Sequence, residues 1–517
     1  MQTLIDKVGM APITGSRIIR NSTVKEAYTV EDRILGIGVS GPVRLATHNA
    51  TGRSFALKSL PTASLSRKRW NMLFDEVEIF LNLDHPHICK LVEVYQDASA
   101  VHLVMELCEG RELSSRLESR TRYSEPEAAV ACIQMLEAVS YLHWQKICHR
   151  DLKLENWVYV DSSEDAKLKL IDFGLSKRFS NLPQGDMEGT AAYMAPEIWE
   201  GTFDEKCDIW ALGVIMYMLL SGSLPFAGVQ SGQIVRKIMM EGFPLSGPRF
   251  EGLSDPAKNF LSQLLEEDPE DRPTAKACMD HPWLASVSAG RGSETGADIS
   301  EDVLKRLQRF SSQNAIKRAA CGLMAWSLSA RDMANLEEQF RRLDKDGSGT
   351  ISLHELSDVL KRRLRMTEAE ARTVFQRLDQ TGDQTLHYTE FLAAAVASRS
   401  ILHKGAIREA FQKFDVDGNG FISLDNLRQV LGDEFGGTQV EDIIAAVGRS
   451  KKGVIEYDDF VKALAERPPD EEDMHMGEEA EVIRRLSRRT IGRISRQEAN
   501  STSGRGAASV PQGEVEK

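Results

Sequence analysis

Two sets of residues in this 517-residue sequence have side chains and spacings suited to chemistry on charged ligands. The first set begins with the glycines of Gly36-x-Gly38-x-x-Gly41, between two strand-like runs, and continues with Lys58 on the next such run. Glycines let backbone amides approach a phosphate closely, and a lysine can pair with its charge. Dinucleotide-binding folds share such a glycine run, but there it opens a helix, whereas here it lies between two strands.

The same set continues with acidic and amide residues downstream. His-Arg-Asp-Leu-Lys-Leu-Glu-Asn (149–156) is followed by Asp-Phe-Gly (172–174) and Ala-Pro-Glu (195–197). Phosphoryl transfer needs a carboxylate that accepts a hydroxyl proton, metal ligands, and cations over the phosphates. All these residue types are present, and their order from about Tyr28 to Leu284 resembles that of serine/threonine protein kinases.

The kinase resemblance implies a role for each matching residue. Catalysis is assigned to Asp151, Lys153, Asn156 and Asp172, with Asn156 and Asp172 as the Mg²⁺ ligands. ATP binding is assigned to Leu35, Gly36, Ile37, Gly38, Val39, Gly41, Val43, Lys58, Glu76, Glu106 and Cys108. Glu78 stays open as the alternative to Glu76 for the carboxylate that pairs with Lys58. Glu112 matches a position where related kinases receive a basic residue upstream of the target serine.

The second set of residues forms four 12-residue loops at repeat spacing. An EF-hand calcium loop takes oxygen ligands from positions 1, 3, 5, 7 and 9 and a bidentate Glu at 12, with Gly at 6. Loop 344–355 fits this pattern fully. Loop 379–390 has Gln384 at position 6, at a cost of about 1 kcal/mol. Loop 415–426 ends in Asn426, and loop 448–459 lacks the first carboxylate and is electropositive.

From these loops we expect calcium ligands in the first three hands and a fourth hand that only pairs with its neighbour. The expected ligands are Asp344, Asp346, Ser348, Thr350, Glu355, Asp379, Thr381, Asp383, Thr385, Glu390, Asp415, Asp417, Asn419 and Phe421.

Between the two sets lies a basic amphipathic stretch, Val303–Trp326. On its own it would be interpreted as a solvated helix, but EF-hand lobes bind segments of this type. The order of kinase, basic junction and four hands resembles the calcium-dependent protein kinases of plants and protists. The resemblance implies a serine/threonine kinase that uses ATP, Mg²⁺ and Ca²⁺ and is inhibited by its junction at low calcium.

Two alternatives stay open. The chain could be a calcium-dependent binding scaffold with little kinase activity. The junction could also recruit external calmodulin, although hands on the same chain have a high effective concentration and would compete with it.

The elements that must position these residues follow from the apolar patterns. Strand-like runs at 28–35, 43–47, 55–59 and 101–107 precede a mostly helical stretch from Glu125, and 286–300 reads as a linker. We predict a multidomain α+β protein, a bilobal protein kinase fold followed by an all-α, four-EF-hand calmodulin-like domain. The predicted limits are 1–27 for an N-terminal extension, 28–284 for the kinase, 285–335 for the linker and autoinhibitory junction, 336–466 for the calmodulin-like domain and 467–517 for a tail.

Composition and charge limit the binding partners and the cellular location that we expect for this chain. The net charge of −13 argues against a nucleic-acid partner. The longest apolar run, 209–220, is too short for a transmembrane segment. The seven scattered cysteines indicate reduced thiols and a cytoplasmic location. The tail is basic between Arg484 and Arg496. Three interpretations stay open: a solvated basic run, phosphorylation of Ser487 after its paired arginines, and weak contact with an anionic membrane surface, worth about 1 kcal/mol per basic residue. Protein substrates are expected to carry basic residues upstream of the target.

Overall fold

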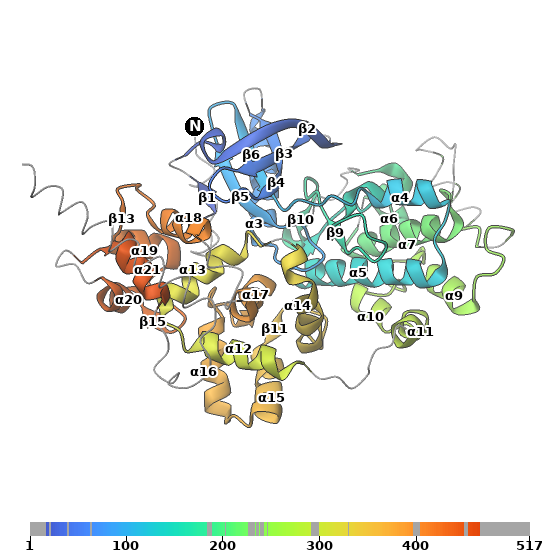
Figure 1. Cartoon of the computed structure of the whole chain (residues 1–517). Coiled ribbons are helices and arrows are strands. Elements are labelled where there is room, and N and C mark those ends of the chain that lie inside the picture. The colour runs from blue at the N-terminus through green and yellow to red at the C-terminus, as the bar shows by residue number, and fades with distance from the viewer. Residues whose placement is uncertain are drawn as a thin grey trace, which may run out of the picture.

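The computed structural model describes residues 17–465, apart from 20–21, 39–40, 63–64, 183–188, 202, 226–232, 234–236, 238–241, 246, 291–298, 329, 397–403 and 449–452. Figure 1 shows a small sheet at the top, a helical lobe to its right and two further groups of helices, one below and one to the left of the sheet. The predicted tail and its basic stretch lie outside the described residues.

The N-terminal lobe is a six-stranded sheet in the order β1-β5-β6-β4-β3-β2. Its strands are β1 (Ile18–Ile19), β2 (Tyr28–Gly38), β3 (Gly41–His48), β4 (Ser54–Pro61), β5 (Leu91–Gln96) and β6 (Ala100–Met105). The helix α2 (Val24–Ala27) precedes β2, and α3 (Arg67–Asn82) packs its apolar face, with Leu73 and Val77, into the core of the lobe. The strand-like runs at 28–35, 43–47 and 55–59 lie in β2, β3 and β4, and the run at 101–107 extends two residues beyond the end of β6; β5 was not predicted.

The strand β1 comes from a segment in which the sequence shows no periodicity. It pairs in parallel with the edge strand β5, with Ile18 opposite Val94. Residues upstream of Tyr28 therefore contribute a strand to the kinase sheet.

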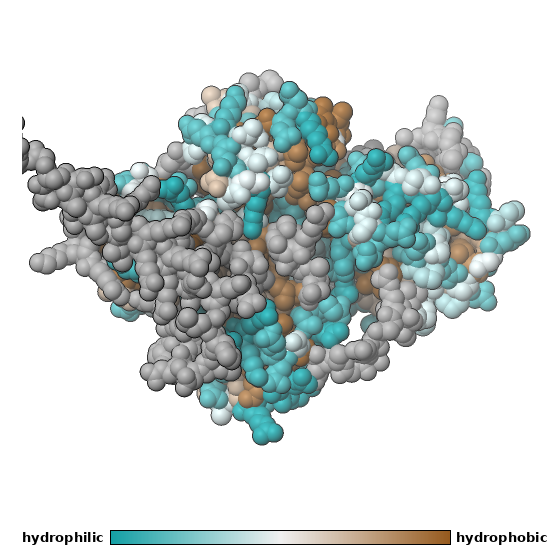
Figure 2. Space-filling model, viewed as in Figure 1, coloured by the Kyte–Doolittle hydropathy of each residue, from teal (hydrophilic) through white to brown (hydrophobic). Residues whose placement is uncertain are grey.

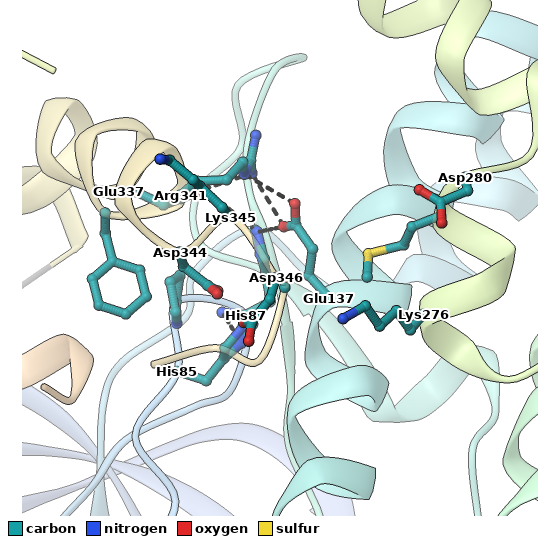
Figure 3. A pocket seen from close by; sticks show the side chains of 14 residues that line it. His85, His87, Glu137, Lys276, Asp280, Glu337, Arg341, Asp344, Lys345 and Asp346 are labelled. Carbon is teal, nitrogen blue, oxygen red and sulfur yellow. Dashed lines mark hydrogen bonds and ion pairs between the residues drawn. The ribbon is translucent and has the colours of Figure 1, made fainter. Parts of the chain in front are cut away.

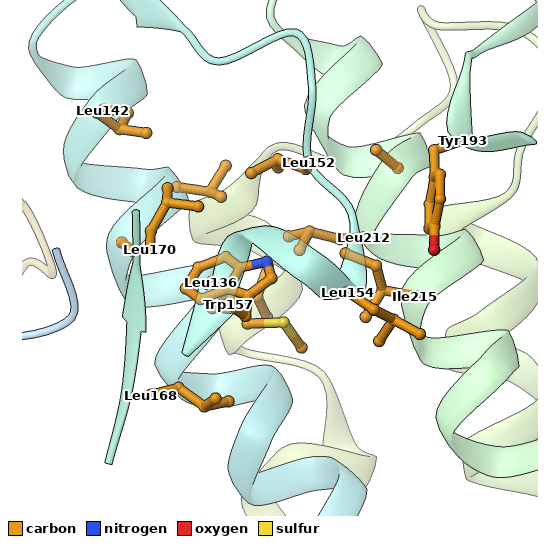
Figure 4. Close-up of a cluster of buried hydrophobic side chains, with 14 of the residues drawn as sticks. Leu136, Leu142, Leu152, Leu154, Trp157, Leu168, Leu170, Tyr193, Leu212 and Ile215 are labelled. Carbon is orange, nitrogen blue, oxygen red and sulfur yellow. The ribbon is translucent and has the colours of Figure 1, made fainter. Parts of the chain in front are cut away.

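The second lobe is mainly helical and has a large apolar core around Trp157 and α5 (Figure 4). A capping box between Ser124 and Glu127 starts α5, as expected for Ser followed by Glu three residues later. The apolar run 209–220 is a buried part of α7. The elements are α4 (Leu113–Arg120), α5 (Glu125–Trp144), β7 (Ile147–Cys148), β8 (Trp157–Tyr159), β9 (Leu168–Leu170), β10 (Lys177–Arg178), α6 (Pro196–Glu200), α7 (Lys206–Ser221), α9 (Asp255–Leu264), α10 (Ala275–Met279) and α11 (Pro282–Gly290).

The four hands pair two by two through short strands in their loops. Ile351 of β11 lies opposite Leu386 of β12, and Ile422 of β13 lies opposite Ile455 of β16. These are the apolar residues that follow each loop start seven residues on. The elements are α14 (Ala330–Leu343), β11 (Ile351–Ser352), α15 (Leu353–Leu364), α16 (Glu368–Leu378), β12 (Thr385–Leu386), α17 (Tyr388–Val396), α18 (Lys404–Phe414), β13 (Phe421–Ile422), α19 (Leu424–Leu431), β14 (Glu434–Phe435), β15 (Thr438–Gln439), α20 (Val440–Val447), β16 (Ile455–Glu456) and α21 (Tyr457–Ala465).

The junction forms two helices inside the calmodulin-like domain. The helix α12 (Glu301–Ser311) packs on α15, α16 and α17 of the first pair of hands. The helix α13 (Ala315–Ala325) contacts α17 and also α18, α20 and α21 of the second pair. Its apolar residues share one buried cluster with the hands, separate from the kinase clusters.

The surface adds two observations. Val30, Ile34 and Ile37 on β2 are exposed, and Figure 2 shows apolar surface over this end of the N-terminal lobe. Among the described residues, none of the helices combines the length and the apolar character that a membrane span requires.

Candidate active site and calcium sites

Three charged residues from different elements meet between the two kinase lobes. Lys58 Nζ of β4 lies 3.4 Å from Glu76 Oε1 of α3 and 3.1 Å from Asp172 Oδ1, just after β9. Glu78, the alternative to Glu76, pairs instead with Arg178 at 3.3 Å. The geometry therefore brings Glu76 to Lys58, so this choice between the two carboxylates is made by the orientation of α3.

The electrostatics of this cluster keep the Lys58–Asp172 pair charged. Burial disfavours the charged form of Lys58 and lowers its pKa, but the negative charges of Glu76 and Asp172 outweigh this effect and raise the pKa above its ordinary value. Burial also works against the carboxylate, and Lys58 holds the pKa of Asp172 below its usual range. Asp172 has a φ of 144°, a conformation that L-residues rarely adopt and that is typical of functional sites.

The loop 149–156 brings the side chains of Lys153 and Asn156 into contact with Asp151. Lys153 Nζ donates to Asp151 Oδ2 at 2.5 Å, and Asn156 Nδ2 donates to the Asp151 carbonyl at 2.7 Å. Because the amide nitrogen of Asn156 is used in this way, its Oδ1 is left as an acceptor. The Asn156 backbone carbonyl accepts the N–H of Ile171, the residue before Asp172. An amide oxygen and a carboxylate are ligand types that suit Mg²⁺.

Asp208 of α7 fixes the backbone of this loop. Its two carboxylate oxygens accept the N–H groups of His149 and Arg150, both at 2.9 Å. Burial opposes ionisation of Asp208, but hydrogen bonding to His143 holds its pKa below the usual value. A buried charged acceptor of this kind holds the loop rigidly in place.

Thr190 is a site residue that the sequence analysis missed. Its Oγ1 and backbone N–H donate to Asp151 Oδ1 at 2.7 and 3.1 Å. Lys153 Nζ also donates to Thr190 Oγ1 at 3.3 Å. Thr190 lies 39 residues beyond Asp151, so local spacing could not associate the two.

The remaining predicted ATP residues line the N-terminal lobe and the connection between the lobes. Gly36 faces Val43 across the β2–β3 pair, and Val43 in turn faces Lys58 across β3–β4. Leu35, Ile37 and Gly38 lie in β2 and Gly41 lies in β3, while Val39 lies outside the described residues. Cys108 follows β6 in the segment that connects the two lobes.

Glu106 directs its side chain into a buried ion pair. Its carboxylate lies 2.9 Å from Lys169 Nζ, and its N–H donates to the Lys90 carbonyl. Any nucleotide contact of this residue therefore falls to its backbone carbonyl.

The first calcium loop gathers three carboxylates. Oxygens of Asp344, Asp346 and Glu355 lie within 4.8 Å of one another. Burial, together with the neighbouring Glu355 and Asp346, raises the pKa of Asp344 to about 7. Crowded carboxylates with the hydroxyls of Ser348 and Thr350 nearby form an oxygen donor set that fits Ca²⁺.

This loop packs directly against the kinase. Ser140 Oγ of α5 donates to the Gly347 carbonyl at 3.1 Å, and a cavity of about 240 Å³ lies between the loop and the kinase (Figure 3). The second hand docks nearby, where Thr389 donates to Asp84 through its N–H and its Oγ1, both at 2.7 Å.

Gly349, at position 6 of the first loop, must be glycine for two reasons, its backbone conformation and its close contact with the kinase. Its φ is +76°, and a Cβ there would lie 2.6 Å from Tyr141 Cδ2 of α5. Gly420, at the same position of the third loop, has a φ of +87° and open space around it.

We expect Gly420→Ala to lower the free energy of unfolding by about 1 kcal/mol, through backbone strain alone. Gly349→Ala should cost a further 1–3 kcal/mol or so, because its methyl group overpacks against the kinase. Denaturant unfolding of both full-length variants measures the difference. Equal losses would show that the contact between loop and kinase contributes nothing.

The second loop closes with its own side chains. Gln384 at position 6 has a φ of +68°, as the missing glycine predicts. Glu390 Oε1 accepts the N–H groups of Gln380 and Thr381 at 2.7 and 2.8 Å. Burial, reinforced by Asp379, raises the pKa of Glu390 to about 8. Asp383 is paired with His387 at 2.6 Å, so calcium must compete with this imidazole.

The third and fourth loops keep fewer suitable groups. Asn426 Oδ1 accepts only locally, from the Ser423 N–H at 3.1 Å, whereas Glu355 reaches back to the start of its loop at Lys345. Asp415 and Asp417 remain together with Asn419, and Phe421 offers its backbone alone. The basic residues expected in the fourth loop lie at 449–452, outside the described residues.

One junction residue bridges both pairs of hands. Arg318 of α13 is buried and donates to the Arg377 carbonyl of the first pair at 2.5 Å and to the Gly436 carbonyl of the second pair at 3.5 Å. Burial, with the nearby Arg377, lowers the pKa of Arg318 to about 10.

Comparisons with known proteins agree with this arrangement. The protein kinase domain family matches residues 29–284, and the EF-hand domain pair family matches 333–396 and 405–465. Calcium-dependent protein kinase 15 of Oryza sativa subsp. japonica is 36% identical over 458 residues, which cover 86% of this chain and 83% of that protein. Calcium-dependent protein kinase 17 of Arabidopsis thaliana is 34% identical over 454 residues, 86% of this chain and 85% of that protein.

A protist relative extends the similarity. Calcium-dependent protein kinase 5 of Plasmodium falciparum is 33% identical over 456 residues, which cover 86% of this chain and 79% of that protein. The predicted fold class and the predicted cofactors ATP, Mg²⁺ and Ca²⁺ are confirmed. The chain therefore belongs to the calcium-dependent protein kinase family and is a calcium-activated serine/threonine protein kinase.

Proposed function

We propose that Asp151 accepts the proton of the substrate hydroxyl, Asn156 and Asp172 hold Mg²⁺, and Lys58 binds the ATP phosphates. The Lys58–Glu76–Asp172 cluster is the observation that supports this assignment most directly. Lys153 lies beside Asp151, where its charge can neutralise the transferring phosphoryl group. Mg²⁺ supplies further charge neutralisation when bound. Thr190 orients the Asp151 carboxylate through the two hydrogen bonds that it donates.

We also propose that the junction switches this site. With calcium bound, the two pairs of hands hold α12 and α13; at low calcium, the released junction blocks substrate access. The shared buried cluster of junction and hands supports the first state. The predicted domain limits belong to the same proposal, and the matches at 29–284, 333–396 and 405–465 support them, although β1 adds residues upstream of 28 to the kinase sheet.

A charge placed in the junction core tests the switch. Leu307 of α12 is fully buried, whereas its neighbour Gln308 is exposed. We expect Leu307→Asp to abolish most calcium activation of phosphate transfer, because the hands can no longer hold α12, while activity in chelator stays low. Gln308→Asp is the matched control and should behave as wild type. Full activation of Leu307→Asp by calcium would refute capture of the junction.

The substrates proposed for this kinase carry a basic residue three positions before the target serine. Glu112, at the start of α4, is partly exposed and accepts a hydrogen bond from Ser114 Oγ at 2.9 Å. A carboxylate at this site can pair with an arginine of the substrate.

We expect wild-type protein to phosphorylate a peptide with Arg at that position about tenfold faster than the Ala peptide, a preference worth about 1.4 kcal/mol. Glu112→Gln should reduce this ratio to near one, and Glu118→Gln, on the exposed side of the same helix, should leave it unchanged. Peptide kinetics for the three proteins measure the ratio. Equal rates of wild type on both peptides would remove the proposed preference.

We propose a cytoplasmic location as well. The seven cysteines are free thiols, consistent with a reducing compartment. Contact of the basic tail with an anionic membrane surface remains a proposal from the sequence.

A further inference from the structure

The residue just before β1, Arg17, is almost completely buried, at 1% exposure, although it belongs to the N-terminal extension. Its backbone carbonyl accepts the Val94 N–H at 2.9 Å, which continues the β1–β5 pairing. In Figure 1, β1 lies at the edge of the sheet that faces the junction helix α13. The chain therefore places this arginine between the kinase sheet and the junction.

The guanidinium of Arg17 ties the end of α3 to β5. Nη1 donates to the Leu91 carbonyl at 2.5 Å, and Nη2 donates to the Leu81 carbonyl. Leu81 lies in the last turn of α3, where carbonyls lack partners within the helix and a cation is favourable. The same helix carries Glu76, one and a half turns earlier, so the cation anchors the element that presents Glu76 to Lys58.

The other side of the guanidinium is covered by the junction. Arg17 Cζ lies 3.7 Å from the ring centroid of Trp326, which follows the last residue of α13. Arg53 of the N-terminal lobe secures the next residue, since its Nη1 donates to the Ser327 carbonyl at 2.7 Å. A stacked indole stabilises a desolvated guanidinium.

Burial of Arg17 depends on these partners. Burial lowers its pKa to about 9, and the nearby Asp84 acts in the opposite direction. A guanidinium without the indole would regain hydration by leaving the end of α3. The position of Trp326 and the anchoring of α3 are thus energetically linked.

We propose that Arg17 is a positioning residue through which Trp326 of the docked junction stabilises α3 and its Glu76–Lys58 pair. The N-terminal extension then takes part in calcium activation. The proposal rests on the role proposed above for Lys58 and adds a role for Glu76, which holds Lys58 in position through their ion pair.

The test uses full-length Arg17→Ala, Trp326→Ala and the double variant, in calcium titrations of phosphate transfer. We expect each single variant to lower kcat at saturating calcium by about tenfold and to raise the half-activating calcium concentration. The double variant should be no worse than either single variant, because both remove the same contact. Trp326→Phe, which keeps an aromatic ring, should recover most of the activity.

Arg116→Ala is the matched control. Arg116 stacks on Tyr159 at 3.5 Å within the kinase, without contact to the junction, and its loss should leave the calcium dependence unchanged. A lower melting temperature of Arg17→Ala with wild-type kcat and calcium dependence would overturn the proposal and leave a purely structural role. Additive effects in the double variant would overturn it as well.

The Trp326 variants keep the test valid if Arg17→Ala does not fold. In that case, wild-type calcium dependence of both Trp326→Ala and Trp326→Phe refutes the link between the junction and α3.

The variant Glu76→Gln separates this proposal from the one that it rests on. If that variant keeps the wild-type kcat, the role proposed for Glu76 fails, whatever Arg17 does.

Discussion

Replacing Asp172 with Asn should reduce phosphate transfer at saturating calcium by about 10³-fold or more, since a single electrostatic contact to a transition state is worth about 10²–10³-fold and Asp172 is also a proposed Mg²⁺ ligand. The substitution removes one negative charge from the cluster with Lys58 and keeps the size of the side chain. The Gly174 N–H donates to Asp172 Oδ1, and the amide oxygen of Asn can accept the same hydrogen bond. The melting temperature should therefore stay close to that of wild type.

Radiolabelled phosphate transfer to a serine peptide measures the effect of Asp172→Asn. Asp75→Asn is the control, because Asp75 is an exposed carboxylate that pairs with Lys177 at the surface. Lys58→Met should lose activity to a similar extent. A wild-type rate in either Asp172→Asn or Lys58→Met would contradict the proposed roles.

The second large effect is expected at Glu355, the proposed ligand at position 12 of the first calcium loop. Glu355→Gln should raise the calcium concentration for half-maximal activation by about tenfold or more, because a two-oxygen anion becomes a neutral amide. Glu355 also lies in the first turn of α15, which packs on the junction helix α12. We therefore expect any movement of this carboxylate toward calcium to be passed to the junction.

Calcium titrations of kinase activity compare Glu355→Gln with Asp459→Asn. Asp459 is at the matching position of the fourth loop, which lacks the first carboxylate, so its replacement should change the midpoint little. Equal shifts in the two variants would contradict this ranking of the hands.

Local patterns predicted the residues that act through fixed spacing. The run 149–156 places Asp151, Lys153 and Asn156 within one short segment, and the expected calcium ligands of each of the first three hands lie within one 12-residue loop, so residue types and intervals suffice to name these candidates. The strands of the hands pair at Ile351 and Leu386 for the same reason, since the repeat itself sets their positions.

Contacts between distant segments could not be predicted in this way. Thr190 reaches Asp151, and Thr389 reaches Asp84 across 305 residues, through the tertiary fold alone. Arg17 stands in a stretch without periodicity, and only the pairing of β1 with β5 brings it to Leu81 and Trp326. For Glu76, by contrast, the kinase resemblance already named the partner of Lys58, and the rotation of α3 agrees, since it turns the alternative Glu78 toward Arg178.

The second pair of hands is joined to the N-terminal lobe of the kinase by a buried ion pair. This ion pair joins Lys413 of α18 at 3.1 Å to Glu93 of β5, the strand that pairs with β1. Breaking one partner of such a pair leaves an uncompensated buried charge, which is strongly destabilising. The second pair of hands is therefore fastened to the N-terminal lobe, while the first pair carries the more complete calcium loops.

The most direct test of calcium-activated phosphoryl transfer is one measurement on the purified full-length protein. Phosphate transfer from MgATP to a serine peptide with an upstream arginine is followed in calcium and in chelator, with Asp172→Asn alongside. We expect transfer at least tenfold faster in calcium than in chelator, a difference of about 1.4 kcal/mol or more in the switch, and no transfer by Asp172→Asn in either. Undetectable transfer by wild type in both conditions, with retained calcium-dependent binding of partner proteins, would contradict the account and favour a binding scaffold.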